Sequence, residues 1–247
     1  YAQAAHDPKP IAELGKALSR RVAEHPQAWD MQDKGTPGLV DALNAAGMLP
    51  THNFREGVFE GVDKLGWKAY ESQILVGRGT CYSCSVRCKR EVEVSTGAHR
   101  VDRRYGGPEY ETLQGFGGCC GIDDLQVVAY ANERCNRHVL DTISTASSIA
   151  FAMECFEHGL IDTTHTDGLE LRFGNAQAML EMIERIARRE GFGDLLSHGT
   201  RHAARVIGGG AERFAIQVKG QELPMHDPRG KVSVGIGYAV GECGADH

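Results

Sequence analysis

Apolar side chains recur every three or four residues along much of this chain, which is the spacing of an amphipathic helix. The first such segment follows Asp7 and Pro8 and ends before Pro26. Its apolar positions share one helical face and are Ile11, Leu14, Leu18 and Val22. This pattern predicts a solvent-facing amphipathic helix.

Four further helices are predicted between residues 123 and 207. They occupy residues 125–139, 142–158, 176–190 and 194–207. Residue types that favour helix ends flank them: Asp123, Asp124, Gly159, Asn175 and Gly191. The faces expected to be buried comprise Leu125, Val128, Ala129, Cys135 and Val139; Ile143, Ala146, Ile149, Ala150, Met153 and Phe156; and Met179, Leu180, Ile183 and Ile186.

The rest of the chain is less regular. Glycine and proline interrupt residues 31–80, which predicts two short helices and loops. Alternating apolar positions predict short strands at residues 91–95 and 214–218. The fold class is therefore mainly α, an irregular multi-helix domain with glycine-rich connections and a few short strands. We place a mostly helical domain at residues 1–210 and the start of a following domain at residues 211–247.

Composition narrows the classes of function. The 247 residues are 41% hydrophobic and 24% charged, with a net charge of −6. This charge gives no general attraction to nucleic acid or to an anionic membrane. We find no apolar run long enough to span a bilayer and no signal peptide pattern, and eight clustered cysteines suit a reducing compartment. We therefore expect a cytoplasmic protein, and its ends, Tyr1 and His247, suggest a piece of a longer chain.

Three cysteines carry the clearest chemistry. Cys81, Cys84 and Cys88 form the pattern C-x-x-C-x-x-x-C, which can bring three thiolates to one metal centre. Thiolates at this spacing fit an iron-sulfur cluster or a tetrahedral zinc, and either site needs a fourth ligand from elsewhere. On a helix the same spacing would make three buried hydrophobes, but Gly79 and the polar neighbours favour a loop.

Other polar segments are weaker candidates. Glu109 and Glu111 would point the same way on an extended stretch and could share a raised pKa, although a solvated loop with one carboxylate capping the following helix is the plainer interpretation. The glycine-rich run at residues 115–121 could approach an anion, and its two thiols could reach a metal. Arg229 lies in a turn and could bind phosphate or carboxylate. His247 could transfer a proton, although a lone histidine is more often structural.

Together these segments resemble the tungsten-containing aldehyde ferredoxin oxidoreductase family. The resemblance depends on motifs in a fixed order from about residue 35 to the end: the three cysteines, Gly107-Pro108-Glu109-Tyr110-Glu111-Thr112, Leu140-Asp141-Thr142-Ile143-Ser144, Arg189-Glu190-Gly191-Phe192-Gly193-Asp194, Glu222-Leu223-Pro224 and Asp227-Pro228-Arg229-Gly230.

The resemblance implies an enzyme that oxidises an aldehyde to a carboxylic acid. Tungsten, or molybdenum, would be held by two pterin cofactors beside one [4Fe-4S] cluster, and electrons would pass to ferredoxin or another electron-transfer subunit. Homo-oligomers are also possible on this resemblance. The residues that match the family's site comprise Cys81, Cys84 and Cys88 as cluster ligands, Glu111 and His247 as catalytic groups, and Asn136, Asp141 and Arg229 as cofactor contacts.

The chain also departs from the family pattern. Asn136 replaces the aspartate that opens the first pterin motif, which keeps hydrogen bonding but removes the charge. The family's second pterin motif, its fourth cluster cysteine and its amino-terminal domain have no counterpart here, so we expect a fragment of a larger enzyme. Three alternatives remain: a cluster-bearing electron-transfer module without pterin, a zinc-stabilised interaction domain, and a tungsten enzyme of the same family that reduces the aromatic ring of benzoyl-CoA.

Overall fold

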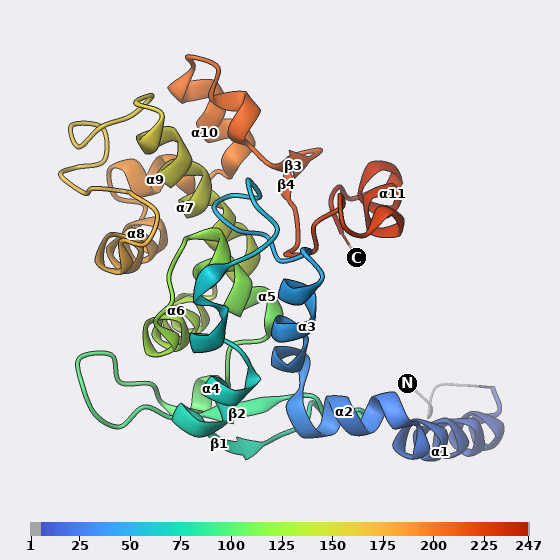
Figure 1. Ribbon diagram of the computed structural model, residues 1–247. Helices are drawn as coiled ribbons and strands as arrows, with labels where there is room; N and C mark the ends of the chain where they lie inside the picture. The colour runs from blue at the N-terminus through green and yellow to red at the C-terminus, as the bar shows by residue number, and fades with distance from the viewer. Residues whose placement is uncertain (1–5, 247) are drawn as a thin grey trace.

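The computed structural model describes residues 6–246, which form a mainly helical molecule with two small hairpins (Figure 1). The helices are α1 (Pro8–Glu24), α2 (Pro26–Lys34), α3 (Val40–Ala45), α4 (Trp67–Gln73), α5 (Tyr110–Leu113), α6 (Leu125–His138), α7 (Thr142–Glu157), α8 (Ala176–Arg188), α9 (Phe192–Leu196), α10 (Thr200–Ile207) and α11 (Val232–Val240). The strands are β1 (Leu75–Arg78), β2 (Arg90–Val92), β3 (Gln217–Val218) and β4 (Gln221–Glu222). The predicted fold class is confirmed.

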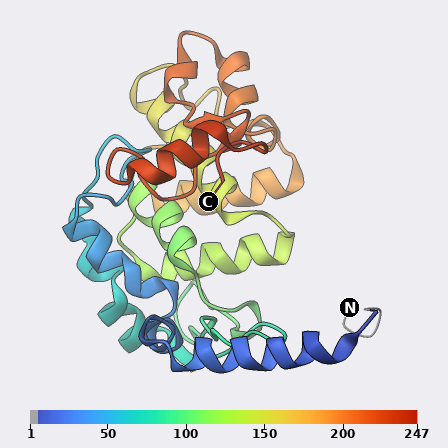
Figure 2. The same ribbon diagram turned by 90° about the vertical axis from the view of Figure 1, so that its right-hand side faces the viewer.

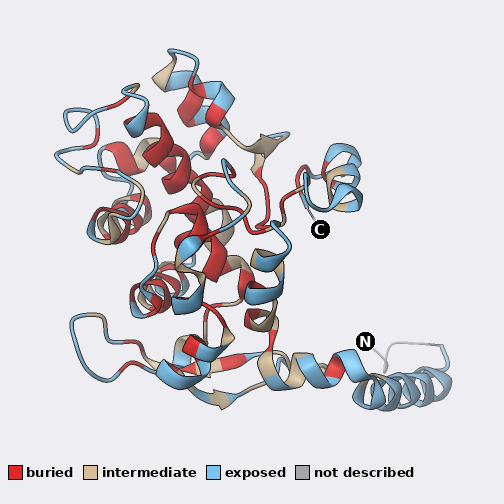
Figure 3. Ribbon diagram, in the orientation of Figure 1, coloured by how far each residue is buried: buried red, intermediate tan, exposed pale blue. Residues whose placement is uncertain are grey.

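Helix α7 lies at the centre of the core (Figure 3). Asp141 begins it by accepting a hydrogen bond from the Ser144 backbone nitrogen at 2.6 Å, as an N-cap side chain does. Every residue from Thr145 to Phe156 is buried, so this stretch of the helix is enclosed on all sides. Helices α5, α8 and α10 pack against it, and the predicted helix at residues 142–158 is confirmed.

Helices α6 and α8 also begin where the sequence predicts. Asp124 caps α6 and Asn175 caps α8 with a side-chain oxygen. The expectation that Val139 is buried is wrong. Val139 takes a left-handed conformation at the end of α6, with φ of 57°, and 91% of its surface is exposed. A left-handed residue ends the helical path, so the apolar face stops before this position.

The two strands β1 and β2 pair antiparallel, with Leu75 opposite Val92 and Arg78 opposite Arg90. The strand predicted at residues 91–95 is confirmed in large part, since β2 ends at Val92 and Val94 forms a further bridge to Val101. This hairpin places the three cysteines of residues 81–88 in the connection between β1 and β2, not on a helix. The expectation of a loop is therefore confirmed.

Two predictions of regular structure are wrong in part. Residues 31–80 hold α3, α4, the end of α2 and strand β1, more than two short helices and loops. Pro26 does not only follow a helix; it opens α2 at the first turn, where proline's missing N–H is not needed. The predicted strand at residues 214–218 shortens to β3, because Phe214 belongs to the 3₁₀ turn Ala211–Phe214.

The helix predicted at residues 194–207 is two helices, α9 and α10. Gly199 separates them with a φ of 82°, a conformation that favours glycine. The buried carboxylate of Glu222 accepts hydrogen bonds from the backbone nitrogen and hydroxyl of Thr200, at 2.8 and 3.0 Å. A tertiary contact thus begins a new helix at a point where periodicity alone indicates continuation.

The glycine-rich run at residues 115–121 is not an open loop. Most of it belongs to a buried π-helix, Gln114–Cys119, that packs against α7. A Cβ atom on Gly115 would lie 2.8 Å from the Cβ of Ala146, so glycine permits close helix contact here. Cys119 and Cys120 are fully buried, and burial raises the pKa of Cys119 to about 12. The interpretation as an anion loop is wrong.

Helix α1 extends away from the rest of the molecule (Figure 2). Ile11, Leu14 and Leu18 are each at least half exposed, and Asp7 caps the helix, as the amphipathic pattern predicts. No single helix within residues 6–246 is long and apolar enough to cross a bilayer; α6 and α7 pass that test only as a pair bent by 118°. The division into domains at residue 210 stays a prediction.

Candidate functional site

A cavity of about 460 Å³ lies between the cysteine loop and the connection from α6 to α7. We call it the thiol-loop cavity. Cys81 and Cys88 line one part of it, and Asn136 and Asp141 line another, together with Glu109. These five residues are separated by up to 60 positions in the chain, yet all of them line one cavity. The fold therefore brings the two most informative motifs together.

Arg90 anchors the cysteine loop from inside the protein. Its side chain is fully buried, and one terminal nitrogen donates to the carbonyl oxygens of Gln32 and Asp33, at 2.9 and 2.6 Å, near the end of α2. The other terminal nitrogen donates to the carbonyl oxygen of Arg87 at 2.8 Å, between Cys84 and Cys88. The guanidinium thus ties the loop to α2. Sequence reasoning missed this residue, because an arginine between Lys89 and Glu91 looks like a solvent-facing charge.

The loop backbone turns toward the sulfur of Cys84. Ser83 and Arg87 have φ of 56° and 60°, and the N–H groups of Arg87 and Val86 lower the pKa of the Cys84 thiol. Backbone donors stabilise a thiolate, which is the form of cysteine that binds metal. Cys88 differs, because burial and then the charge of Glu109 raise its pKa. A positive cluster or ion would offset both of these effects.

Glu109 and Glu111 do not share an extended stretch, so that expectation is wrong. Glu111 lies in the first turn of α5, whereas Glu109 is the residue just before it and makes no capping hydrogen bond through its side chain. The Glu109 carboxylate accepts a hydrogen bond from the Thr36 hydroxyl, and burial raises its pKa. The two carboxylates therefore lie in different environments. Glu109 lines the thiol-loop cavity, and Glu111 contacts residues 225–226.

Glu111 is held at both oxygens. One accepts a hydrogen bond from the Met225 backbone nitrogen at 2.6 Å, and the other lies 3.2 Å from Nε2 of His226. Burial raises the pKa of Glu111 to about 7; the Met225 N–H opposes this shift and the charge of Asp141 adds to it. A carboxyl group with this pKa exchanges its proton near neutrality, which suits a general acid or base. His226 is a neighbour that sequence reasoning missed.

Asn136 and Asp141 occupy the end of α6 and the start of α7. The Asn136 amide donates to the carbonyl oxygen of Asn132 at 2.9 Å, one turn earlier, and its side-chain oxygen remains available as an acceptor. Asp141 uses one carboxylate oxygen to cap α7. Both side chains line the thiol-loop cavity, so they can present hydrogen-bonding groups to a polar heterocycle there.

The two remaining candidates lie elsewhere or outside the described residues. Arg229 pairs with Asp227 at 2.6 Å and donates to the Phe54 carbonyl oxygen at 2.5 Å, and it does not line the thiol-loop cavity. These contacts hold the turn at residues 227–230 against the segment near Phe54, and a cofactor role for Arg229 stays a prediction. His247 lies outside the described residues, so its predicted role also stays a prediction.

The donor chemistry fits a sulfur-bound metal centre, but the side chains are not gathered around one point. Within residues 6–246, no group of three or more His, Cys, Asp or Glu side chains is close enough to hold a metal ion. Three cysteines on one exposed loop, with a thiolate-stabilising backbone at Cys84, are nevertheless soft ligands that a cluster could order on binding. The residues lining the thiol-loop cavity include no histidine that could complete a zinc site.

Comparisons with known proteins agree on one family. A family model described as aldehyde ferredoxin oxidoreductase, domains 2 & 3, matches residues 13–247. The chain is 38% identical over 214 residues to the tungsten-containing aldehyde ferredoxin oxidoreductase of Thermococcus kodakarensis, and 37% identical over 214 residues to that of Pyrococcus furiosus. Each alignment covers 86% of this chain and 34% of the relative. The chain thus spans about a third of the length of these curated relatives.

More distant similarity extends to a protein with another name and to a solved structure. A protein of Pyrococcus furiosus named aliphatic sulfonate oxidoreductase, WOR-like subunit, is 29% identical over 172 residues, which cover 67% of this chain and 27% of that protein. The solved active-site complex BamBC of benzoyl coenzyme A reductase superposes with a TM-score of 0.64 at 21% identity, covering 84% of this chain and 32% of that one. This structural likeness shows the fold alone.

Proposed function

Because this chain belongs to the aldehyde ferredoxin oxidoreductase family, we propose that it supplies the cluster-binding loop and part of the pterin site of a tungsten-dependent enzyme. The proposed reaction oxidises an aldehyde to a carboxylic acid. This reaction consumes one water and releases two electrons and two protons. Relatives that are 38% and 37% identical to this chain over 214 aligned residues carry tungsten and aldehyde ferredoxin oxidoreductase in their names.

One observation carries the proposal. The cysteine loop and the Asn136–Asp141 segment face the same cavity, although they come from different parts of the fold. A redox enzyme of this kind needs its electron-accepting cluster beside its organic cofactor, so that electrons cross a short distance. Cys81, Cys84 and Cys88 would hold three corners of the cluster, and Asn136 and Asp141 would hydrogen-bond a pterin ring. When bound, the tungsten-pterin group would accept two electrons, and the cluster would pass them outward one at a time.

The protein's own contribution is proton transfer. Glu111 has a pKa of about 7, so near neutrality it can take one of the protons that the oxidation releases. His226 lies 3.2 Å from the same carboxylate and can receive that proton in turn. The Met225 N–H fixes the other carboxylate oxygen, which keeps the group oriented through the cycle.

The electron acceptor would be ferredoxin or an electron-transfer subunit. Cys81 is exposed and Cys84 is partly exposed on the β1–β2 connection, which is where a cluster would lie near the surface. Electrons can then leave without crossing the helical core. A second subunit would take the place of ferredoxin if the holoenzyme is a complex.

The test is an anaerobic assay of the holoenzyme with a panel of aldehydes and an oxidised viologen dye. We expect dye reduction that depends on the aldehyde, with the matching carboxylic acid as product. A parallel assay supplies reduced viologen, and its oxidation in the presence of an aryl-CoA substrate, with no aldehyde turnover, would establish the ring reductase in its place. Colourless protein that contains zinc would support the zinc-stabilised domain and contradict both redox functions.

A further inference from the structure

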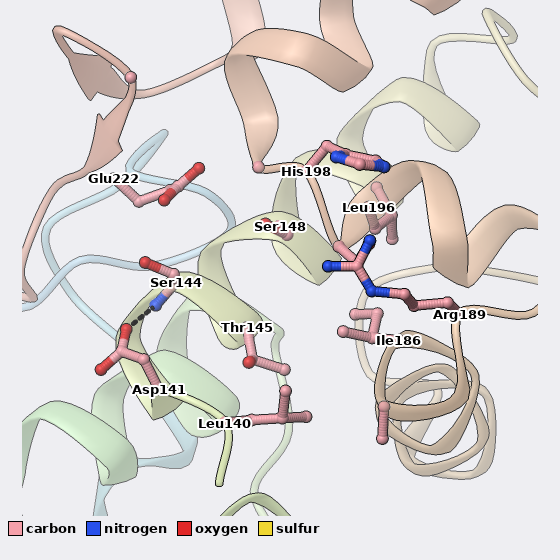
Figure 4. Close-up of a pocket in the computed structure, with 14 residues that line it drawn as sticks. Leu140, Asp141, Ser144, Thr145, Ser148, Ile186, Arg189, Leu196, His198 and Glu222 are labelled. Carbon is pink, nitrogen blue, oxygen red and sulfur yellow. Dashed lines mark hydrogen bonds between the residues drawn. The ribbon is translucent and has the colours of Figure 1, made fainter. Parts of the chain in front are cut away.

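A second cavity, of about 410 Å³, lies between α7 and the segment from α8 to α10 (Figure 4). We call it the α7–α10 cavity. It meets the thiol-loop cavity at Leu140 and Asp141, which line both. Neither the predicted cofactor contacts nor the proposed proton transfer uses its other side chains, so its polar lining has no assigned role.

The floor of this cavity is a row of hydroxyl groups on α7. Ser144, Thr145 and Ser148 line it, and Figure 4 shows them along one stretch of the helix. Thr145 and Ser148 are only 6% and 2% exposed as whole residues, and both line the cavity. Among the described residues neither hydroxyl has a hydrogen-bond partner in the protein, so each can donate to a polar ligand in the cavity.

A guanidinium and an imidazole face this row from the other side. Figure 4 shows Arg189 and His198 on the α8–α10 side of the cavity, opposite the hydroxyls of α7. Arg189 takes a left-handed conformation at the end of α8, with φ of 54°, and among the described residues its guanidinium makes no hydrogen bond. Its nearest carboxylate oxygen, on Asp194, is 3.9 Å away. The five N–H donors of the guanidinium are therefore available to a ligand.

The carboxylates of the cavity are at its opposite end and are already engaged. Asp141 accepts the backbone N–H of Ser144, and Glu222 accepts both donors of Thr200. They would repel an anion from their own end and leave the space between Arg189 and the hydroxyl row as the favourable place for it. A planar guanidinium matches a carboxylate or phosphate with two parallel hydrogen bonds.

We propose that the α7–α10 cavity binds the carboxylate or phosphate group of the substrate, with Arg189 as the main contact and Thr145 and Ser148 as hydrogen-bond donors. This inference rests on the proposed function, because the substrate is taken to be an aldehyde that carries a second, anionic group. The two cavities adjoin, since Leu140 and Asp141 line both, and this places the anionic group of the substrate next to the thiol-loop cavity.

Binding is tested first, without turnover. Inorganic phosphate is titrated into the full chain by calorimetry, with amide shifts near residues 145–148 and 197–198 followed by NMR. We expect saturable binding that Arg189→Gln weakens by about 10-fold or more and Ser148→Ala by about 3-fold, as losses of a charged and a neutral hydrogen bond. Arg188→Gln removes the same charge one residue away, where the side chain pairs with Glu184, and should change affinity less than about 2-fold.

Ser147→Ala is the matched control for the hydroxyls. Ser147 is buried and without a hydrogen-bond partner on the same helix, but it does not line the cavity, so its loss should leave phosphate affinity unchanged. Thermal melts of every variant check that each one folds. An absence of saturable binding by the natural sequence, or equal weakening by Arg188→Gln and Arg189→Gln, overturns the proposed site.

The substrate assignment is tested in the holoenzyme. Arg189→Gln should raise KM for succinic semialdehyde by about 10-fold while changing KM for uncharged butanal by less than about 2-fold. Phosphate binding with no such difference in KM overturns the substrate assignment and favours a cofactor phosphate as the ligand. If no aldehyde is oxidised and phosphate still binds through Arg189, the proposed function has failed and the anion site stands.

Discussion

At the scale of single residues, burial decides the chemistry of this site more than sequence spacing does. Glu109 and Glu111 are two positions apart, but one faces the thiol-loop cavity and the other is enclosed against Met225 and His226. Among the cysteines, backbone donors lower the pKa of Cys84, whereas burial raises the pKa of Cys119 to about 12. Residue type alone therefore does not distinguish Glu111, the proposed proton-transfer group, from Glu109. It also does not distinguish the proposed ligand thiols from the thiols of the core.

Glu111→Gln tests the proton-transfer role. A base must be ionised to accept a proton, so with a pKa of about 7 the rate of the natural enzyme should rise as pH increases through about 7. The variant should lose about 10²- to 10⁴-fold in kcat and this pH-dependent rise. The measurement is kcat as a function of pH, from pH 5.5 to 8.5. Glu93→Gln is the control. Glu93 is an exposed carboxylate that precedes α5 in the sequence, and its change should leave the pH profile unaltered.

Stability supplies a second measurement for the same residue. The folded-state pKa of Glu111 is raised above its unfolded value, so the stabilisation that its neutral form provides is present at low pH and is lost as pH rises through about 7. Thermal melts of the natural protein should therefore show a larger drop between pH 5 and pH 8 than those of Glu111→Gln. Equal drops would contradict the assigned pKa.

Arg90→Lys tests the anchor of the cysteine loop. Lysine keeps the charge but cannot reach three carbonyl oxygens in the geometry of the guanidinium fork, so buried acceptors lose their partners. We expect a loss of about 2 to 4 kcal/mol in the free energy of unfolding and a lower iron content. Denaturant titration and iron analysis measure both. Arg87→Lys is the control, because its side chain is exposed on the same loop; a similar loss there would count against an anchoring role for Arg90.

At the scale of elements, sequence predicts the long helices well and the short ones poorly. Caps and periodicity locate α6, α7 and α8, because an Asp or Asn side chain and a continuous apolar face act locally. The break at Gly199 escapes prediction, since it depends on Glu222, more than twenty positions away. The buried π-helix at Gln114–Cys119 escapes for the same reason: its glycines serve close packing against α7, and glycine-rich runs more often form loops.

Sequence likewise identifies some residues of the candidate site and misses others. The thiol motif is identifiable from the spacing of its cysteines, and Asp141 is identifiable from the order of the motifs. Arg90, His226 and Arg189 are not, since their roles arise from carbonyl oxygens, a carboxylate and a cavity that only the folded chain assembles. No local pattern indicates such residues in advance.

Asp141 has two roles that separate variants can distinguish. Asp141→Ala removes the cap of α7 and should cost about 1 kcal/mol in the free energy of unfolding, whereas Asp141→Asn retains a capping oxygen and should cost less than about 0.5 kcal/mol. Both variants should lower the pterin content of the holoenzyme if the carboxylate contacts the cofactor. Asp124→Ala removes the cap of α6 and serves as the control, with lost stability and normal pterin content. Full pterin content in Asp141→Asn would show that Asp141 acts only as a cap.

At the scale of the whole molecule, the site is built by bringing distant segments to one face of a helical core. The β1–β2 connection, the residues before α5 and the α6–α7 connection all meet at the thiol-loop cavity, and the α7–α10 cavity adjoins it at Leu140 and Asp141. The chain spans about a third of the length of its curated relatives. We propose that the cysteine loop holds an iron-sulfur cluster next to a tungsten-pterin site.

Elemental analysis of protein purified without oxygen, with its visible spectrum, tests this claim most directly. We expect tungsten, or molybdenum, together with about four irons per protein, and a broad absorption that disappears in Cys84→Ser while the buried Cys135→Ser control retains it. Zinc in place of iron, or iron that survives the loss of Cys84, would contradict the account.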